Sequence, residues 1–403
     1  MHSGKRLATM MIVVLSVISF MVINACDTEK GEEPVLEWSS TIGGPLLFDS
    51  LSGIFQTSDG GYLANGNRTS AFGDTPTQNV NENFMLKLDE NGNETWRLST
   101  TISDMKETEN GNYLFVRYAG KYFLTSINAS GNMISDAPVD TSAVIGRTFS
   151  TTQYHLTADN GCIAINIDDS VMPERLWLTK FTMTGALLFS LSYEIDMGYP
   201  IVAFANADDG GFVICRNDYS NDQFTSSILK FDPSGELSWT KPLYEVPNVG
   251  ANTKVYGITQ IVPLSDGGYL AKGDITMPQS ISPEGYYGYF VKKISGDGIE
   301  LWQKNFSSRY TLPGDSCMVE TADNEYVICG HKRFYNSLGD ILFGDYDAYL
   351  WITTLDADGT VLMEKAYNKE KYGTGQAICS TEDGGFVIAG TEADDIVIRK
   401  FID

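Results

Sequence analysis

Side chains that could carry chemistry are few in this chain, and their spacing matches no catalytic motif. His155 and His331 stand alone, without the partner residues of a general base or a metal site. The run Asp356-Ala357-Asp358-Gly359 begins like a calcium loop but lacks the further ligands and the closing glutamate of an EF-hand. The sequence has no phosphate-binding loop, no G-x-S-x-G elbow and no heme motif. We therefore predict no catalytic, cofactor-binding or metal-ligating residue and no cofactor, although carboxylates that meet in space leave a glycosidase or lyase open.

Six cysteines offer a second kind of chemistry. Lipidation of Cys26, argued below, leaves an odd number, so at least one thiol stays free. No Cys-x-x-Cys or Cys/His spacing indicates zinc. Several of these cysteines occupy core positions of expected strands, where a free cysteine behaves as a small hydrophobic side chain. The sequence thus predicts buried thiols rather than a disulfide framework at Cys162, Cys215, Cys317, Cys329 and Cys379.

A short turn phrase recurs along the chain and defines the elements that position every side chain. Its full form is Asp-Gly-Gly followed by an apolar residue. The seven copies are spaced by 49 to 60 residues and contain Asp59, Asn110, Asp159, Asp209, Asp266, Asp323 and Asp383. Glycine in this turn permits a positive φ in a tight hairpin, and the apolar runs on both sides are typical of strands.

A second phrase, Lys-Leu-Asp-x-x-Gly in its full form, alternates with the first. In most copies a tryptophan or another large apolar residue follows four residues after the glycine. The six glycines are Gly92, Gly131, Gly185, Gly235, Gly298 and Gly359. A short polar side chain three residues before the glycine can close the turn by bonding the backbone. Each repeat therefore contains four strands and no credible helix, which is the unit of a β-propeller.

The two ends of the chain predict the number of blades. The last repeat ends one strand early, near Phe401, whereas a spare strand with a tryptophan, residues 36–40, occurs near the N-terminus. Pairing of these segments closes the ring and removes free sheet edges. We therefore predict an all-β fold, a single seven-bladed β-propeller of four-stranded antiparallel blades over residues 36–403. Its last blade is closed by the N-terminal strand.

The motifs Thr57-Ser58-Asp59-Gly60-Gly61-Tyr62 and Lys87-Leu88-Asp89-Glu90-Asn91-Gly92-Asn93 resemble those of a large group of bacterial secreted propeller-repeat proteins. The resemblance covers nearly all of residues 36–403. It implies the fold and an extracytoplasmic location, not one shared activity. The second repeat departs from the pattern, with Asn110 in its first turn and Ser135 in place of the tryptophan. Blade 2 is therefore expected to be thinner and less stable than its neighbours.

Residues 1–25 have the features of a secretory signal peptide, with Lys5 and Arg6 before an apolar run and a small residue before Cys26. The stretch Ile23-Asn24-Ala25-Cys26 resembles the bacterial lipobox, which implies cleavage before Cys26 and acylation of this residue. Residues 26–35 are polar and acidic, and we expect a disordered tether there. An acidic stretch after the lipidated cysteine resembles the export signal of surface lipoproteins in some Gram-negative bacteria. We expect an outer-membrane lipoprotein at the cell surface, with the periplasmic face as the alternative.

The acidic composition limits the partners. The chain has 28 lysines and arginines against 52 aspartates and glutamates, a formal net charge of −24. Such a charge repels phosphate backbones and anionic headgroups. We therefore expect no nucleic-acid partner, contact with a membrane only through the lipid on Cys26, and a soluble, monomeric body.

Strand order predicts which face of the propeller binds a ligand. The first and third turns of every blade lie on one face, and the longer connections lie on the other. Loops of variable length on a rigid scaffold are where binding residues concentrate. The longest are expected at 67–83, 273–288 and 331–347. Aromatic side chains there can stack on sugars or anchor a protein, and the candidates are Tyr286, Tyr287, Phe334, Tyr335 and Tyr346.

We therefore expect a lipid-anchored cell-envelope propeller that binds a glycan or a protein through its long-loop face, with no catalytic role. Two other classes remain open. One is a periplasm-facing scaffold that assists assembly of envelope proteins, and the other is a propeller enzyme that acts on polysaccharide. Protease shaving of intact cells separates the first two classes. A pocket at the central channel that joins two or more carboxylates with a basic residue favours the enzyme.

Overall fold

The described residues of the chain fold entirely into strands and their connections. The computed structural model describes residues 31–32, 34–43, 47–70, 81–141, 151–171, 173–195, 198–220, 223–246, 257–277, 286–308, 317–334, 347–367, 373–392 and 395–402. They form twenty-eight strands in seven antiparallel sheets of four strands each. Within these ranges, no helix is long and apolar enough to cross a membrane.

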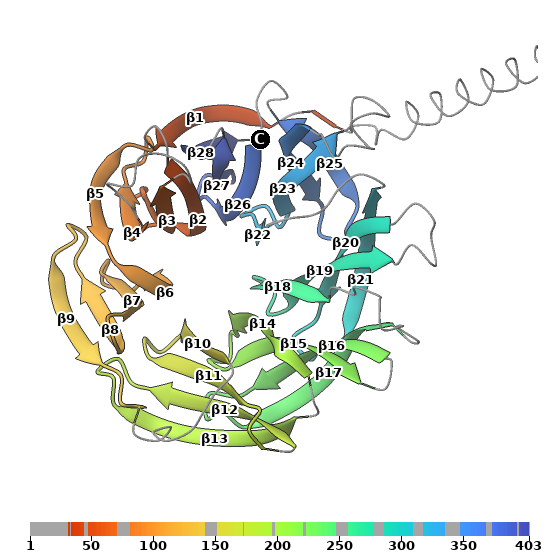
Figure 1. Ribbon diagram of the computed structural model, residues 1–403. Helices are drawn as coiled ribbons and strands as arrows, with labels where there is room; N and C mark the ends of the chain where they lie inside the picture. The colour runs from red at the N-terminus through yellow and green to blue at the C-terminus, as the bar shows by residue number, and fades with distance from the viewer. Residues whose placement is uncertain are drawn as a thin grey trace, which may run out of the picture.

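The seven sheets surround a central opening as the blades of a propeller (Figure 1). We number the blades in chain order and give their strands from the innermost outward. Blade 1 contains β2 (Leu47–Gln56), β3 (Tyr62–Ser70), β4 (Asn81–Leu88) and β5 (Glu94–Ser99). Blade 2 contains β6 (Thr101–Glu107), β7 (Tyr113–Tyr118), β8 (Tyr122–Ile127) and β9 (Met133–Pro138). Blade 3 contains β10 (Thr151–Leu156), β11 (Cys162–Asp168), β12 (Glu174–Phe181) and β13 (Leu187–Ile195).

The other four blades follow the same order. Blade 4 contains β14 (Gly198–Asn206), β15 (Phe212–Ser220), β16 (Gln223–Phe231) and β17 (Leu237–Val246). Blade 5 contains β18 (Ile258–Pro263), β19 (Tyr269–Met277), β20 (Tyr286–Ile294) and β21 (Glu300–Ser308). Blade 6 contains β22 (Cys317–Glu320), β23 (Tyr326–Phe334), β24 (Asp347–Leu355) and β25 (Val361–Tyr367). Blade 7 contains β26 (Gly373–Ser380), β27 (Phe386–Glu392), β28 (Asp395–Ile402) and, from the other end of the chain, β1 (Val35–Ile42).

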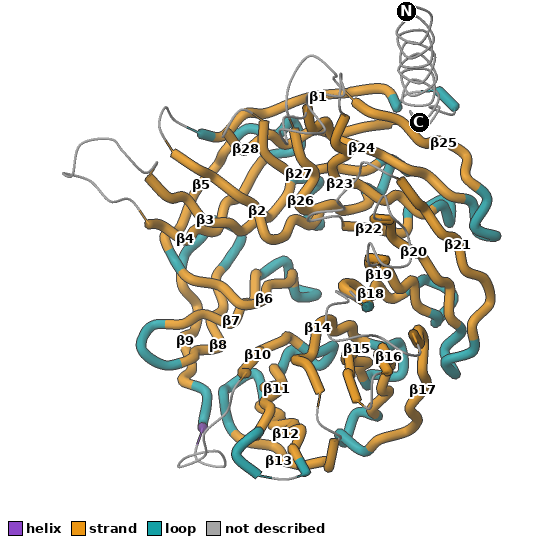
Figure 2. The backbone as a smooth tube through the Cα atoms, turned by 45° about the vertical axis from the view of Figure 1, so that its right-hand side comes forward, coloured by secondary structure: helices purple, strands orange, loops and turns teal. Residues whose placement is uncertain are grey.

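Blade 7 confirms the predicted closure of the ring. β1 pairs antiparallel with β28, with Leu36 opposite Phe401 and Ile42 opposite Ile396. Figure 2 shows β1 along the outer side of β28. The two ends of the described chain therefore share one sheet, so the N-terminal strand covers what would be the free edge of β28.

In five of the seven blades an ion pair joins the two repeated phrases. The lysine of the second phrase is buried or, at Lys293, nearly so, and its ammonium contacts the aspartate of the first turn in the same blade. The pairs are Lys87–Asp59 at 2.9 Å, Lys180–Asp159 at 2.8 Å, Lys230–Asp209 at 2.6 Å, Lys293–Asp266 at 2.8 Å, and Lys400–Asp383. Blade 2 replaces both partners, with Asn110 and Ser126 at these positions, and blade 6 has Thr354 in place of the lysine.

The aromatic residue after the second turn covers the neighbouring blade. Trp96 of blade 1 donates its indole N–H to the carbonyl oxygen of Ala129 in blade 2, at 2.9 Å. Trp38 of β1 lies over the turn glycine of blade 1, where a Cβ added to Gly92 would come within 2.5 Å of the indole ring. Its ring also meets Tyr62 edge to face, with centroids 5.6 Å apart. The N-terminal strand thus supplies the contact between blades 7 and 1.

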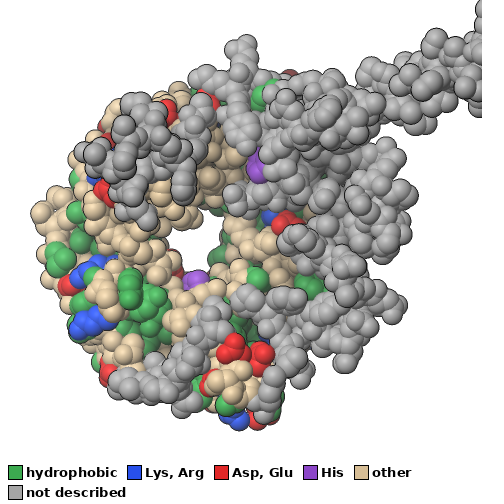
Figure 3. Space-filling model, in the orientation of Figure 1, with side chains coloured by type: hydrophobic (Ala, Val, Ile, Leu, Met, Phe, Trp, Pro, Cys, Tyr) green, Lys and Arg blue, Asp and Glu red, His purple; other side chains and the backbone are tan. Residues whose placement is uncertain are grey.

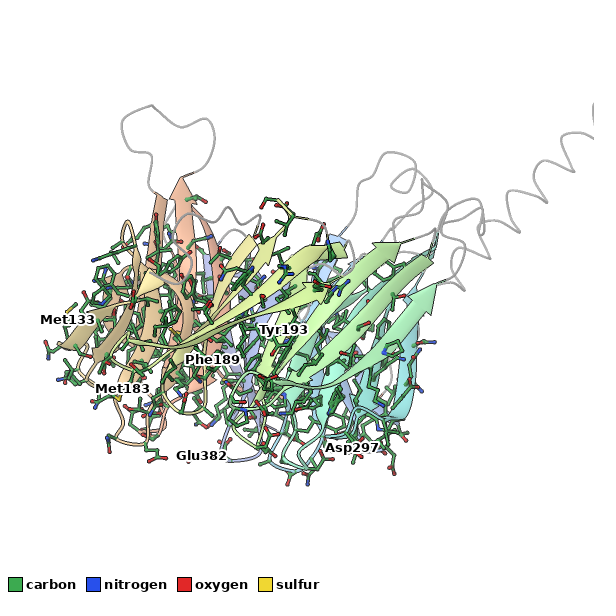
Figure 4. All side chains as sticks on the ribbon, turned by 90° about the horizontal axis from the view of Figure 1, so that it is seen from below. Met133, Met183, Phe189, Tyr193, Asp297 and Glu382 are labelled. Carbon is green, nitrogen blue, oxygen red and sulfur yellow. The ribbon has the colours of Figure 1, made fainter. Side chains whose placement is uncertain are left out.

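The short turns share one face of the disc, as strand order predicts. Met183, Asp297 and Glu382 belong to turns of blades 3, 5 and 7, and all three lie toward the same edge in Figure 4. We call this side the turn face. The opposite side, where the second strand of each blade is joined to the third and each blade to the next, is the loop face.

Candidate functional site

Three of the five predicted aromatic candidates lie in strands, which corrects the expected loop boundaries. β20 begins at Tyr286 and includes Tyr287, and β23 ends at Phe334. The hairpin ladders continue to these residues, with Tyr286 opposite Met277 and Phe334 opposite Asp347. Hydropathy alone did not predict this continuation, because it depends on backbone hydrogen bonding between the two strands.

The structure brings these three residues to the loop-face ends of the neighbouring blades 5 and 6. The other two candidates, Tyr335 and Tyr346, lie outside the described residues. Tyr289, further along β20, packs within the blade. Its ring stacks on that of Phe306 in β21, with centroids 4.6 Å apart. A ligand role for the five candidates stays a prediction.

Blade 2 carries an aromatic surface on the loop face. Its second and third strands are joined by a tight hairpin with Gly120 at a φ of +76°. Tyr118 and Tyr122 are opposite each other at the base of this hairpin, with ring centroids 5.0 Å apart. Tyr122 in turn stacks on Tyr154 of blade 3, at 3.9 Å and 30°. Tyr118 is 49% exposed and Tyr154 only 6%, so the three rings form a tyrosine ladder from the surface into the interface between blades 2 and 3.

The tyrosine ladder lies at the loop-face end of the boundary between blades 2 and 3. Figure 3 shows hydrophobic side chains gathered over the region of β7, β8 and β10, next to the opening, with basic side chains toward the rim. Burial raises the pKa of the Tyr122 and Tyr154 hydroxyls, and the proximity of Tyr118 adds to the rise at Tyr122. The two hydroxyls therefore stay protonated and uncharged at neutral pH.

Basic side chains lie on the other face of the same hairpin, because Arg117 and Phe123 alternate with Tyr118 and Tyr122 along the paired strands. The Arg117 guanidinium lies 4.4 Å from the ring centroid of Phe123, and the Lys121 ammonium lies 5.2 Å from it. Arg117 also donates to Asp136, from Nε to Oδ1 at 3.0 Å. Burial raises the pKa of Asp136, but hydrogen bonds from Arg117 and Thr125 outweigh it and hold the pKa below the ordinary value. Asp136 thus neutralises Arg117, whereas Lys121 is exposed at the hairpin tip.

The innermost strands place a titratable pair beside the channel. Both oxygens of Asp104 on β6 accept backbone hydrogen bonds at 2.8 Å, one from Leu156 of blade 3 and one from Met105. His155 lies in the inner strand β10, and its Nδ1 is 3.9 Å from Asp104 Oδ2. The imidazole stacks on Phe204 of blade 4, with centroids 4.3 Å apart. This cluster braces blades 2, 3 and 4 against one another.

Burial shifts the two groups of this pair in opposite directions. It raises the pKa of Asp104 to about 6, although the two backbone hydrogen bonds and Lys106 lower it. It lowers the pKa of His155 to about 4. The side chains are 32% and 24% exposed, so water reaches both. At pH 7 the pair consists of a carboxylate and a neutral imidazole.

We expect the two groups to oppose each other in the pH dependence of stability. Because its pKa is raised, the Asp104 carboxyl group binds a proton more readily in the folded chain than in the unfolded chain. Its contribution to stability is complete below about pH 4 and is lost as the pH rises through 6. His155 has no effect on the free energy of unfolding above about pH 6.5. As the pH falls from 6.5 toward 4, the unfolded chain binds a proton at His155 that the folded chain does not bind, and the fold loses stability. Asp104→Asn should therefore lose stability between pH 6 and 4 relative to wild type, and His155→Gln should gain it, each by about 1 kcal/mol because of solvent screening. Urea unfolding at pH 4.5, 6 and 7 measures both slopes, and equal slopes in the two variants would contradict the assignment.

Among the described side chains, no group of three or more histidines, cysteines, aspartates or glutamates could hold a metal ion. Asp356 and Asp358 instead close a turn. The Asp356 carboxylate accepts backbone N–H groups from Asp358 at 3.0 Å and from Thr360 at 2.7 Å. This arrangement fits the turn chemistry expected from the repeat rather than a calcium loop.

Sequence reasoning missed the tyrosine ladder because its rings come from two blades. The available signal was the pair of tyrosines that flank Gly120, four residues apart across a short hairpin. From the departures of blade 2 from the repeat, the sequence analysis predicted only a thinner and less stable blade. Its four strands span only six or seven residues each, against up to ten in blade 1, and its lower stability stays a prediction.

The fold defines the class of protein: a seven-bladed β-propeller with an aromatic surface on its loop face. No family model and no curated protein matches the chain. Among solved structures, extracellular domains 1–2 of Drosophila Semaphorin 1a are similar, with a TM-score of 0.50 and 11% identity over 92% of this chain and 88% of that chain. A Penicillium chrysogenum alpha-L-arabinanase complexed with arabinobiose has a TM-score of 0.43 and 11% identity over 75% of this chain and 93% of that chain. A protein of unknown function from Bacteroides caccae has a TM-score of 0.37 and 11% identity over 73% and 94%. At these identities the likeness concerns the fold alone.

Proposed function

We propose that this propeller is a lipid-anchored binding module of the bacterial cell envelope, and that it binds a carbohydrate chain on its loop face. The observation that carries the proposal is the tyrosine ladder. Tyr118 is about half exposed, and exposed aromatic rings can stack on the apolar faces of sugars. The signal-like N-terminus and the resemblance of residues 23–26 to a lipobox support the anchor at Cys26.

The ladder is held ready for binding by the residues behind it. Tyr122 stacks between Tyr118 and Tyr154, and Tyr154 is buried in the interface with blade 3. A ligand that stacks on Tyr118 therefore has little side-chain entropy to remove, and preorganisation of this kind strengthens binding. Lys121 adds a positive charge at the hairpin tip of an otherwise acidic protein. Because the protein as a whole repels polyanions, the site suits a neutral glycan or one with isolated acidic groups that meet Lys121.

A binding role fits the described residues better than catalysis. Hydrolysis of a glycosidic bond needs two carboxyl groups on opposite sides of the bond. In the described channel wall, both oxygens of Asp104 are engaged by backbone N–H groups, and its neighbour His155 is neutral at pH 7. This pair serves the contacts between blades. A role as a scaffold for envelope assembly remains the second candidate, and the cellular experiment below separates it.

A glycan-binding screen tests the proposal with matched variants. Wild type, Tyr118→Ala and Lys121→Ala are compared on acidic and neutral polysaccharides, with affinities measured by calorimetry. Tyr118→Ala should weaken binding roughly 5- to 10-fold through loss of stacking. Lys121→Ala should weaken binding of acidic glycans and leave neutral ones unchanged. Met133→Ala removes another exposed side chain of blade 2, on its outer strand, and should have no effect.

Two outcomes decide against this site. Absence of binding to every polysaccharide rejects the carbohydrate proposal. Binding that resists Tyr118→Ala and Lys121→Ala but is lost on substitution of Tyr286, Tyr287 or Phe334 moves the site to blades 5 and 6. Protease shaving of intact cells tests the location separately, because a surface lipoprotein is cleaved whereas a periplasm-facing scaffold survives.

A further inference from the structure

Two cysteines of blade 6 face each other across its inner hairpin. Cys317 is the first residue of β22 and is directly paired with Cys329 of β23. Their Sγ atoms are 3.0 Å apart, closer than the about 3.5–4 Å of ordinary contacts between non-bonded heavy atoms. Cα atoms of directly opposite antiparallel residues are about 4.5–5.5 Å apart, which lies inside the range of about 4.4–6.8 Å found in disulfides. We propose that Cys317 and Cys329 form a cross-strand disulfide.

The packing selects this pair over any other. Cys317 and Cys329 belong to one hydrophobic cluster between blades 6 and 7. The remaining three cysteines of the propeller are buried in three different clusters: Cys162 between blades 2 and 3, Cys215 between blades 4 and 5, and Cys379 between blades 7 and 1. Each is surrounded by aliphatic and aromatic side chains from its own two blades. All five cysteines are buried, as the sequence predicts, and they divide into one close pair and three single thiols.

The bond strengthens the shortest inner strand of the propeller. β22 spans four residues, whereas each of the other six innermost strands spans at least six. A covalent link between its first residue and β23 closes a segment of the chain and restricts the unfolded state, which stabilises the fold. The bond also holds β22, the innermost strand of blade 6, to β23, with which it forms only four residue pairs. The bond fits the extracytoplasmic location proposed above, because disulfides persist in oxidising compartments.

The reaction is a thiol–disulfide exchange whose oxidant is an external disulfide, such as oxidised glutathione or a thiol–disulfide oxidoreductase. The Cys317 thiolate attacks the external disulfide, forms a mixed disulfide and releases one thiol. The Cys329 thiolate then attacks the Cys317 sulfur, closes the protein disulfide and releases the second thiol, so two protein thiols are oxidised and one disulfide is reduced. Burial and the neighbouring Cys329 raise the pKa of the Cys317 thiol well above its ordinary value, although Lys272 lowers it. Closure is therefore fastest while the hairpin is still forming.

Refolding in a glutathione buffer tests the proposal without reference to location. Reduced, denatured protein is refolded with reduced and oxidised glutathione, free thiols are alkylated under denaturing conditions, and a glutamate-specific protease cuts after Glu320 and Glu325. The two cysteines then sit in separate peptides that remain joined only through the bond. We expect this joined pair, lighter by two hydrogens than the two free peptides together, and complete alkylation of Cys162, Cys215 and Cys379. The oxidised protein should unfold a few degrees above the reduced protein.

Matched variants make the result decisive. Cys317→Ser and Cys329→Ser should each remove the joined peptides and the difference in unfolding temperature between oxidised and reduced protein. Cys215→Ser, which removes a single thiol in another cluster, should keep both. Complete alkylation of Cys317 and Cys329 in correctly refolded wild type overturns the proposal. So does a bond from either residue to a cysteine of another cluster.

Discussion

A chain that lacks β1 is expected to associate into oligomers and to unfold at a lower temperature than the intact protein. β1 covers β28 with seven residue pairs, from Val35 opposite Ile402 to Ile42 opposite Ile396. Its removal exposes the backbone N–H and C=O groups of β28, and an unpaired edge of this length is a template for pairing with another chain. Light scattering after size exclusion and a thermal melt measure both effects on a chain that begins at residue 43.

Trp38→Ala separates packing from strand pairing in this prediction. The substitution keeps the backbone of β1 but removes the ring that covers Gly92 and meets Tyr62. We expect a loss of about 3 kcal/mol in the free energy of unfolding, without association. Trp96→Ala makes the same change at an internal interface and should cost a similar amount. A truncated chain with unchanged melting temperature and mass would contradict closure of the ring through blade 7.

The fold was predictable from the sequence because its information is local and repeated. Positive φ values at Gly60 and Gly92 confirm the turns expected at the two phrases. The count of seven blades followed from the unmatched strands near Trp38 and Phe401, since any other count leaves a strand without a partner. Turn residues and the number of strands can be read from the sequence without knowing which side chains are in contact.

Contacts between blades were not predictable in the same way. Each tyrosine of the ladder lies in a strand, and its place in the sequence does not distinguish it from other strand residues. The three rings form one surface only because Tyr122 of blade 2 stacks on Tyr154 of blade 3. The pairing of Cys317 with Cys329 likewise depends on the register of one hairpin. The length of the strand that begins at Tyr286 was also missed, because loop and strand residues there share the same composition. Sequence patterns therefore identified the scaffold, and geometry identified the candidate site.

The lysine–aspartate pairs are expected to respond very differently according to which partner is removed. In blade 4 the Lys230 ammonium is buried and bonds Asp209 at 2.6 Å, whereas the Asp209 side chain is more than half exposed. Asp209→Asn leaves the ammonium with the Phe231 carbonyl at 3.3 Å but without its counter-charge, which should cost about 2 kcal/mol because water screens the exposed side of the pair. Lys230→Met keeps the apolar stem and removes the buried charge, so the cost should be nearer about 1 kcal/mol. Urea unfolding at pH 7 measures both.

The same pair predicts sensitivity to acid. Burial raises the pKa of Asp209, but the hydrogen bonds from Lys230 and from the Gly211 N–H outweigh it and hold the pKa below the ordinary value of 3.8. A carboxyl group with a lowered pKa contributes stability that is complete above that value and is lost as the pH falls through the lowered pKa. Lys230→Met should therefore lose less stability than wild type between pH 5 and 2. The double variant with Asp209→Asn should match Lys230→Met at pH 7, and Asp208→Asn, in the same turn, should match wild type. If Asp209→Asn is no less stable than Lys230→Met, the buried ammonium does not depend on its aspartate, and the ion pair is not what links the two phrases.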